Sequence, residues 1–395
     1  MSSTAKLLQI SIGPRVRKSP FFAATLRYGA EAFTVYNHTY MPTSYGDNVR
    51  DYWSLVNDVT LWDVSCQRQV EIAGPDAYRL VEFLSARDMS GCGVGQCQYI
   101  LLTDEAGGIV NDAVLLRIEQ NRYWISPGDG DVLWWVKGVA VSRGLDVSVV
   151  EPDVSPLQLQ GPKAPHVAYA LFGDWALDLK YYHLRETSLH DIPLVVSRTG
   201  WSGEHCYEIY LRDSQFGDRL WERIMQAGRK YNIAPTSPST IRSIEGGLLS
   251  YRSDITTDDN PWTVGMGRFV HLDRDADFIG REALQKIRTE GTPRRLVGVE
   301  IDGDALDFND ALWAVQHKGV KVGHVSRCCF SPRLKKNIGW ANLPVELTEI
   351  GTQFALLTPA GERGLKVCEA PWFKSFVAIP EALKAEIRSG NKAAN

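Results

Sequence analysis

Apolar and polar residues alternate along several short segments, which is the pattern of a strand with one buried face. The segments with this alternation are residues 69–72, 114–118, 147–150, 194–197 and 207–211. Between them, apolar residues recur every three or four positions over residues 75–86 and 218–231, which predicts amphipathic helices. Because strands and helices alternate irregularly, the pattern predicts an α+β fold rather than a doubly wound α/β fold.

A change in pattern near residue 292 predicts a domain boundary. Residues 286–293 are rich in charge and end in Gly291-Thr292-Pro293, which is typical of a linker. Strand-like runs dominate after it, at residues 296–301, 321–326 and 354–358. We therefore expect a core over residues 1–292 and a β-rich domain over residues 293–395, with a tail after residue 381 that begins as a short helix and then frays.

One predicted hairpin places two polar residues at the start of a strand. Gly107 and Gly108 separate two strand-like runs, which indicates a tight turn, and Asn111 and Asp112 follow on the returning strand. Polar side chains at strand ends are candidates for a binding site.

A second strand, residues 207–211, carries a carboxylate and a phenol at alternate positions. Glu208 and Tyr210 should face one way, and Tyr207 and Ile209 the other. Such a pair can bind a heteroaromatic ring, since the carboxylate accepts paired N–H bonds that the phenol helps to orient. The alternative is that this face is simply solvated.

Composition narrows the classes of function. The 43 basic and 47 acidic residues leave a net charge of −4, which argues against binding to nucleic acid or anionic membrane. Residues 1–13 lack the apolar run of a secretion signal, and we expect a cytoplasmic protein. The seven cysteines and eight histidines show no zinc-ligand spacing, so no metal is expected, whereas twelve tryptophans suit a site for flat or cationic ligands.

Several short segments, taken together, resemble the folate-dependent aminomethyltransferases of the glycine cleavage system. They are LWDVS at 61–65, GGIVND at 107–112, LQGP at 159–162, TGW at 199–201 with Tyr207-Glu208, and EGGL at 245–248 with Tyr251. Within that superfamily, other segments are similar to the demethylase branch, which includes dimethylsulfoniopropionate demethylase and tetrahydrofolate-dependent O-demethylases. These are SPF at 19–21, VYNH at 35–38, PTS at 42–44, RD at 87–88 and DNP at 259–261.

The resemblance implies a fold, a cofactor and a set of site residues. The fold would be two interleaved α+β folate-binding domains followed by a C-terminal β-barrel, and the cofactor would be tetrahydrofolate. Asp112 matches the aspartate beside the reactive folate nitrogens, and Glu208 matches the glutamate that binds the pterin ring. The remaining matches to the folate site are Tyr99, Ser126, Trp201 and Tyr210.

Two departures from the aminomethyltransferases affect these expectations. The family has an arginine where this chain has Ser243, with Arg242 shifted by one position, so a contact to the folate carboxylates from this position is left open. The Asp-Asp pair of that branch is Asn111-Asp112 here, as in the demethylases. We therefore expect a small-molecule methyl donor as partner rather than a lipoyl carrier protein, and leave the oligomeric state open, with a homodimer as one alternative.

The expected reaction moves a methyl group in line from this donor to N5 of tetrahydrofolate, with Asp112 stabilising the positive charge that N5 acquires. Because aromatic residues are dense, we expect the donor to be a carboxylate-bearing aryl methyl ether of the methoxybenzoate type. A sulfonium such as dimethylsulfoniopropionate is the alternative, and a non-catalytic folate-binding protein ranks below both.

The amino-terminal segment is expected to bind the donor. By the branch resemblance, Phe21, Tyr36 and His38 would line the donor pocket. An aryl ether leaves as a phenolate, and His38 is the candidate general acid for that step. A purely structural histidine is the alternative.

Overall fold

The computed structural model describes residues 12–392. The expectation of no secretion signal rests on residues 1–13, and most of these lie outside the described residues. The last residues of the tail also lie outside them. At the start of the described chain, α1 leads into a hairpin and a second helix. Their bounds are α1 Phe22–Arg27, β1 Ala32–Tyr36, β2 Thr39–Ser44 and α2 Asn48–Asn57.

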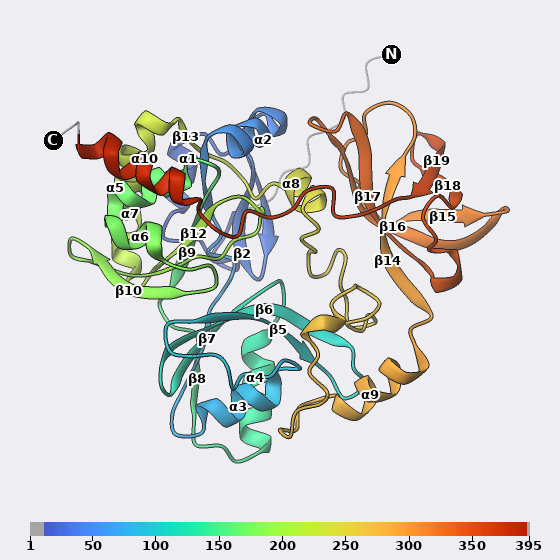
Figure 1. Ribbon diagram of the computed structural model, residues 1–395, viewed down its shortest axis with the longest axis horizontal. Helices are drawn as coiled ribbons and strands as arrows, with labels where there is room; N and C mark the ends of the chain where they lie inside the picture. Colours follow the sequence, from blue (N-terminus) through green and yellow to red (C-terminus); the bar gives the residue numbers. More distant parts are fainter. Residues whose placement is uncertain (1–11, 393–395) are drawn as a thin grey trace.

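The first sheet has six strands in the order β10-β11-β12-β9-β3-β13. The strands are β3 Val59–Asp63, β9 Ser155–Gln160, β10 Leu184–Leu189, β11 Ile192–Ser197, β12 Cys206–Leu211 and β13 Ile233–Pro235. Helices cover one face of it and bury a single apolar cluster that includes Leu157, Ile209 and Trp221 (Figure 1). These helices are α5 Ala164–Phe172, α6 Asp174–Asp178 and α7 Gly217–Gly228.

The second sheet has five strands in the order β5-β6-β7-β4-β8 and is formed by chain that lies between β3 and β9. Its strands are β4 Val70–Ala73, β5 Cys97–Thr103, β6 Ile109–Glu119, β7 Arg122–Pro127 and β8 Ser148–Val150, and its helices are α3 Ala77–Leu84 and α4 Val132–Ser142. The two helices cover one face and bury Leu80 and Val136. Because the chain leaves the first sheet to build the second and then returns, the two α+β units are interleaved, as expected.

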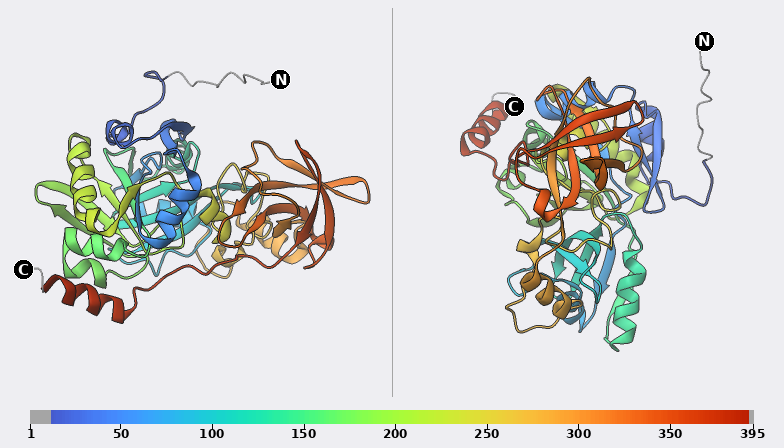
Figure 2. Two further views of the ribbon diagram at one scale, coloured as in Figure 1. Left: turned by 90° about the horizontal axis from the view of Figure 1, so that it is seen from above. Right: turned by 90° about the vertical axis from the view of Figure 1, so that its right-hand side faces the viewer.

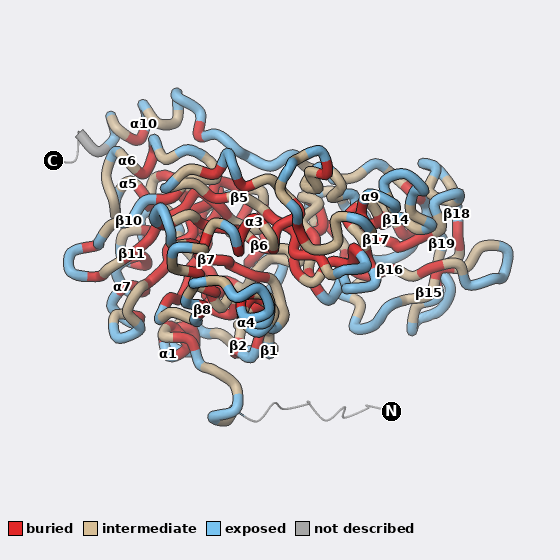
Figure 3. Tube along the Cα trace, turned by 90° about the horizontal axis from the view of Figure 1, so that it is seen from below, coloured by how far each residue is buried: buried red, intermediate tan, exposed pale blue. Residues whose placement is uncertain are grey.

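The faces that the helices leave uncovered contribute to a shared cluster. Trp124 on β7 and Tyr210 on β12 lie 6.0 Å apart between ring centroids, in a buried cluster that also holds Cys97 and Val195. Buried residues accordingly run through the middle of the molecule as well as through the core of each sheet (Figure 3). This internal face is where side chains from both sheets can meet.

The carboxy-terminal strands close into a barrel in the order β14-β17-β16-β15-β18-β19, which confirms the β-barrel expectation. The strands are β14 Arg294–Ile301, β15 Trp313–His317, β16 Val320–Ser331, β17 Lys336–Pro344, β18 Gln353–Thr358 and β19 Gly361–Val367. Two helices lie between the sheets and the barrel along the chain, α8 Thr240–Glu245 and α9 Arg281–Glu290. Short 3-10 helices cover Ser214–Phe216, Arg229–Tyr231, Gly267–Phe269 and Val345–Leu347.

After β19 the chain leaves the barrel and returns across the core to the helices of the first sheet (Figures 1 and 2). Along this strap, residues 369–380, the Phe376 amide donates to the Gly203 carbonyl at 2.7 Å. The strap ends in α10, Glu381–Lys392, where Arg388 pairs with Asp174 and Asp178, both at 2.9 Å. The strap therefore ties the barrel side of the molecule to the first sheet.

The structure confirms the strands and helices predicted from periodicity and corrects one segment. Residues 286–290 were expected to be linker, but they form the last turns of α9. The reason is packing, since Leu284 is fully buried and Ile287 packs against the same small cluster. Only residues 291–293 connect α9 to the barrel, and the division of the chain at residue 292 stays a prediction. The expected tail helix is α10, and the end of its expected fraying lies outside the described residues.

Candidate functional site

A buried carboxylate lies on β6 facing the phenol of Tyr99. The Tyr99 hydroxyl donates to Asp112 Oδ2 at 2.7 Å, while Asp112 Oδ1 is buried without a hydrogen-bond partner. Burial raises the pKa of Asp112, and the hydrogen bond from Tyr99 opposes that rise. An unpartnered oxygen on a buried carboxylate is costly in the empty protein, which suits an atom whose partner is a ligand.

The hairpin between β5 and β6 explains where this carboxylate lies. Gly107 has a φ of +82°, a turn conformation that favours glycine, as the predicted hairpin requires. Asn111 then anchors the strand: its Nδ2 donates to the Asp129 carbonyl at 3.1 Å, and its Oδ1 accepts from the Gly128 amide at 2.9 Å. Asn111 and Asp112 point to opposite sides of the strand, so anchoring the first leaves the second directed at the site.

The register of three strands gathers further predicted residues beside Asp112. Tyr99 on β5 and Ser126 on β7 both pair with Val114 of β6, two positions from Asp112. Cross-strand partners and alternate residues share one face of a sheet. Tyr99, Asp112 and Ser126 therefore lie on the same face, and Ser126 Oγ accepts from the Gln69 amide at 2.9 Å.

The second carboxylate, Glu208, is held by three donors, two on strands of the first sheet and one in the loop after β11. The Tyr210 hydroxyl donates to it at 2.8 Å, and the side chains of Gln158 and Thr199 also donate to it. This confirms that Glu208 and Tyr210 face one way, while Tyr207 and Ile209 enter the apolar cluster behind them. The face is buried rather than solvated, since Glu208 is only 3% exposed.

The two carboxylates belong to neighbouring parts of one buried region. The charge of Glu208 adds to burial in raising the pKa of Cys97, two residues before Tyr99 on β5. Trp201, at the edge of this region, donates from Nε1 to the Leu249 carbonyl at 3.2 Å. Five of the six residues expected to bind folate thus lie on the faces of the two sheets that meet inside the molecule, and Trp201 lies in the loop between β11 and β12.

The three residues expected to bind the donor are not brought together. Burial, with the charges of Asp112 and Asp129, raises the pKa of Tyr36 well above its ordinary value, so Tyr36 lies near the site. Phe21 instead lies in the apolar cluster behind the first sheet, 6.3 Å from Trp221 between ring centroids. Its burial among helices leaves no face for a ligand.

His38 lies at the tip of the β1–β2 hairpin with its side chain 62% exposed. Its Nε2 is 3.0 Å from Asp131 Oδ1, and the preceding Asn37 amide donates to Asp129 at 2.8 Å. The hairpin tip is therefore fastened to the loop after β7. The pairing with Asp131 gives the exposed imidazole a partner outside the buried site.

Sequence reasoning missed the partners that hold the site together. Gln158 donates to Glu208 but belongs to a strand that carried no separate signal, whereas Thr199 belongs to the recognised segment TGW that also contains Trp201. It also missed Arg327 of the barrel, whose Nη1 donates to Ser243 Oγ at 3.0 Å. Only the fold brings residues so distant in sequence together.

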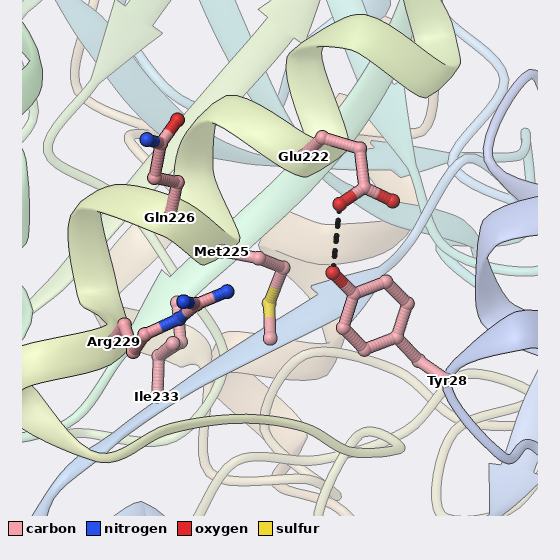
Figure 4. A pocket seen from close by; sticks show the side chains of 6 residues that line it. All are labelled: Tyr28, Glu222, Met225, Gln226, Arg229 and Ile233. Atoms are coloured by element: carbon pink, nitrogen blue, oxygen red, sulfur yellow. Dashed lines mark hydrogen bonds between the residues drawn. The ribbon is translucent and has the colours of Figure 1, made fainter.

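A hollow of about 390 Å³ has a lining that includes neither carboxylate (Figure 4). It lies between α1 and α7, where the Tyr28 hydroxyl donates to Glu222 at 2.8 Å. The rest of its lining is formed by Met225, Gln226, Arg229 and Ile233. Its side chains are largely exposed and carry no unpartnered buried group, so it offers no comparable chemistry.

Within residues 12–392, no helix is long and apolar enough to cross a membrane. Among the same residues, no three His, Cys, Asp or Glu side chains are grouped so that they could hold a metal ion.

Both parts of the chain match known protein domains. Residues 21–274 match the GCVT N-terminal domain, and residues 294–374 match the glycine cleavage T-protein C-terminal barrel domain. The dimethylsulfoniopropionate demethylase DmdA of Ruegeria pomeroyi is 37% identical over 358 residues, 91% of this chain and 98% of that protein. An aminomethyltransferase of Symbiobacterium thermophilum is 30% identical over 372 residues, 91% of this chain and 98% of that protein. The crystal structure of aminomethyltransferase T of the glycine cleavage system from Bartonella henselae superimposes with a TM-score of 0.83 at 21% identity, covering 92% of this chain and 100% of that one.

Proposed function

Because the chain belongs to the glycine cleavage T-protein family, we propose that it is a tetrahydrofolate-dependent demethylase whose methyl donor is a small sulfonium compound. Folate-dependent transfer of a one-carbon group is the activity of the family. The sulfonium donor is supported by the 37% identity to the dimethylsulfoniopropionate demethylase. This reverses the order in the sequence analysis, which ranked an aryl methyl ether first.

The residues of the internal face fit tetrahydrofolate. The cofactor carries an N–H-rich pterin ring, and Glu208 presents a buried carboxylate that has one acceptor position left beside its bonds from Gln158, Thr199 and Tyr210. Asp112 Oδ1, buried and unpartnered, presents a second acceptor. Tyr99, Ser126, Trp201 and Tyr210 would line the ring and its linker. When bound, tetrahydrofolate supplies a secondary amine that accepts the methyl group.

Asp112 would act by charge. Its only hydrogen-bond partner among the described side chains is the neutral phenol of Tyr99, at 2.7 Å, so no cation compensates it. A preorganised negative charge in a water-poor site stabilises positive charge that develops during the reaction. Tyr99 would keep this carboxylate oriented, and burial would hold water away from it.

The same uncompensated charge is the observation that favours a sulfonium donor. Asp112 acts on Tyr36, so its charge lies near a phenol ring, whereas Asp129, which also acts on Tyr36, is paired with Arg252 at 3.5 Å. A cation is attracted to such a charge and to the face of an aromatic ring. A sulfonium leaves as a neutral sulfide, so the transfer needs no general acid, which agrees with an exposed His38 that is paired with Asp131.

A donor panel tests this proposal. The purified protein would be incubated with tetrahydrofolate and either dimethylsulfoniopropionate or a methoxybenzoate, and 5-methyltetrahydrofolate would be measured by chromatography. We expect product with the sulfonium and none with the ether, and no loss of methyl groups without folate. Turnover of the ether alone would replace the sulfonium by the aryl ether, and demethylation without folate would overturn the proposal entirely.

A further inference from the structure

One arginine of the barrel reaches out of it and bonds to residues of the core. Arg327 on β16 donates from Nε to Asp254 Oδ2 at 2.6 Å, from Nη1 to Ser243 Oγ at 3.0 Å and from Nη2 to the Leu248 carbonyl at 2.8 Å. The residue is only 9% exposed. Each guanidinium nitrogen therefore has a partner outside the barrel, in the segment 243–254.

A bulge in β16 aims this side chain. The pairing with β17 shifts between Val325 and Arg327, so Ser326 is the extra residue. Consecutive residues of a regular strand point to opposite faces, but here Ser326 Oγ also donates to Asp254, at 2.6 Å. Two successive barrel residues thus hold one carboxylate of the core, and the bulge makes this possible.

The segment that Arg327 holds forms a wall beside Asp112. The Tyr251 hydroxyl donates to the Ile109 carbonyl of β6 at 3.1 Å. A methyl group added at Gly128 would lie 3.1 Å from Tyr251 Cβ and 3.3 Å from Asp112 Oδ1, so these three residues are in close contact. Trp201 meets the same segment through its hydrogen bond to the Leu249 carbonyl.

The Arg327 guanidinium also packs on Trp201 directly. The guanidinium carbon lies 5.7 Å from the Trp201 ring centroid, within the range of a cation–π contact. The Trp201 indole is therefore held twice, by the Leu249 carbonyl at its N–H and by the Arg327 guanidinium at its ring. Ser243 leaves room for this arrangement, since an arginine there would bring a second cation against Arg327.

We propose that Arg327 is a positioning residue through which the barrel shapes the folate site. It orients Trp201 and the 248–254 wall, and it does not bind folate itself, because its nitrogens are already bonded and Asp254 balances its charge. The inference rests on the proposed function, since Trp201 is assigned to folate there.

Binding of tetrahydrofolate, measured by calorimetry, tests this role. Arg327→Lys keeps a cation for Asp254 but loses the fork that reaches Ser243 and Leu248. The double variant Arg327→Met with Asp254→Asn removes both charges and leaves no orphaned ion in the core. Arg295→Met, an exposed arginine of the same barrel, is the matched control. We expect both Arg327 variants to weaken folate binding by about tenfold or more and the control to leave it unchanged.

A double-mutant cycle with Trp201→Phe separates positioning from general destabilisation. If Arg327 acts through Trp201, the loss caused by Arg327→Lys shrinks in the Trp201→Phe background, whereas independent effects add. Additive losses, or folded Arg327 variants that bind folate like the parent, would overturn the inference. A parent protein that binds no tetrahydrofolate would instead overturn the proposed function. If the double variant does not fold, Arg327→Lys alone decides.

Discussion

At the scale of single residues, Asp112 carries the reaction proposed here. We expect Asp112→Asn to lower kcat by about 10²–10³, because the amide keeps the shape and loses one preorganised charge. Its Nδ2 or Oδ1 still meets the Tyr99 hydroxyl, so the fold should hold. Steady-state kinetics with donor and folate varied separately would check this, and a kcat within about threefold of the parent would mean that Asp112 is only structural.

The pKa of Asp112 predicts how the rate depends on pH. Burial raises this pKa above 3.8, and only the ionised carboxylate stabilises positive charge. The rate at saturation should therefore fall as the pH decreases through a value above the ordinary range of aspartate. The residual activity of Asp112→Asn should lack this decrease at low pH. If the rate of both proteins fell over the same pH range, the decrease would belong to another group.

Glu208 should determine folate affinity rather than rate. Glu208→Ala removes an acceptor and leaves Gln158 and Tyr210 without their partner, at a cost of about 2–3 kcal/mol in folate binding. Calorimetry would measure it. Glu222→Ala, in the hollow of Figure 4, is the matched control and should bind folate normally. Equal affinity in both variants would remove Glu208 from the pterin site.

Sequence patterns indicated the site residues unevenly. Period two placed Glu208 and Tyr210 on one face, and the hairpin signal placed Asp112 at a strand start, because both depend on local geometry. Phe21 and His38 were grouped with the donor by resemblance alone, and the structure places one in a core and the other at an exposed turn. Arg327 could not be predicted, since its role depends on a bulge and on a partner 73 residues away.

At the scale of elements, the β5–β6 hairpin tolerates little change. A Cβ at Gly108 would lie 2.2 Å from the Thr257 carbonyl oxygen, whereas one at Gly138 in α4 would meet nothing within 4 Å. We expect Gly108→Ala to lower the free energy of unfolding by about 1–3 kcal/mol, through overpacking against the backbone. Gly138→Ala should raise it by about 0.5–1 kcal/mol, as alanine does inside a helix.

Urea denaturation of both variants would measure these changes. Equal stability of the two proteins would show that the loop around Thr257 yields easily. The prediction also bears on function, because Gly108 lies four residues before Asp112 on the same hairpin. A destabilised Gly108→Ala protein should therefore lose activity as well.

At the scale of the whole molecule, the strap should respond to pH. His205 contacts Phe376 of the strap with ring centroids 5.5 Å apart, and burial lowers its pKa from 6.5 to about 4. The unfolded chain thus binds a proton more readily than the folded one between these values. The contribution of neutral His205 to the free energy of unfolding is fully present above the ordinary pKa of histidine. It is lost as the pH falls, by about 2 kcal/mol near pH 5.

Urea denaturation at about pH 7.5 and about pH 5 would measure this loss in the parent and in His205→Gln, which cannot titrate. Between these two pH values, the free energy of unfolding should fall by about 2 kcal/mol less in the variant than in the parent. An identical pH dependence in the two proteins would assign the effect to other groups.

The overall fold was partly accessible from the sequence. A β-rich carboxy-terminal domain followed from strand-like runs after residue 292, its closure into a barrel came only from the resemblance, and the irregular order of elements excluded a doubly wound sheet. The interleaving came only from the resemblance, because periodicity does not reveal which strands pair. The linker was misjudged since the apolar residues of α9 that pack in a core, such as Leu284 and Ile287, are few among many charges.

Interleaving also sets an order for folding during synthesis. The five-stranded sheet is continuous in the chain, from Val70 to Val150, so all its strands leave the ribosome together. The first sheet begins earlier, with β3, yet β3 must wait for β9 before it gains a neighbour. The five-stranded sheet is therefore complete before the first sheet. Once residues up to about 155 have left the ribosome, the nascent chain should already protect the second sheet from protease while β3 is still cleaved.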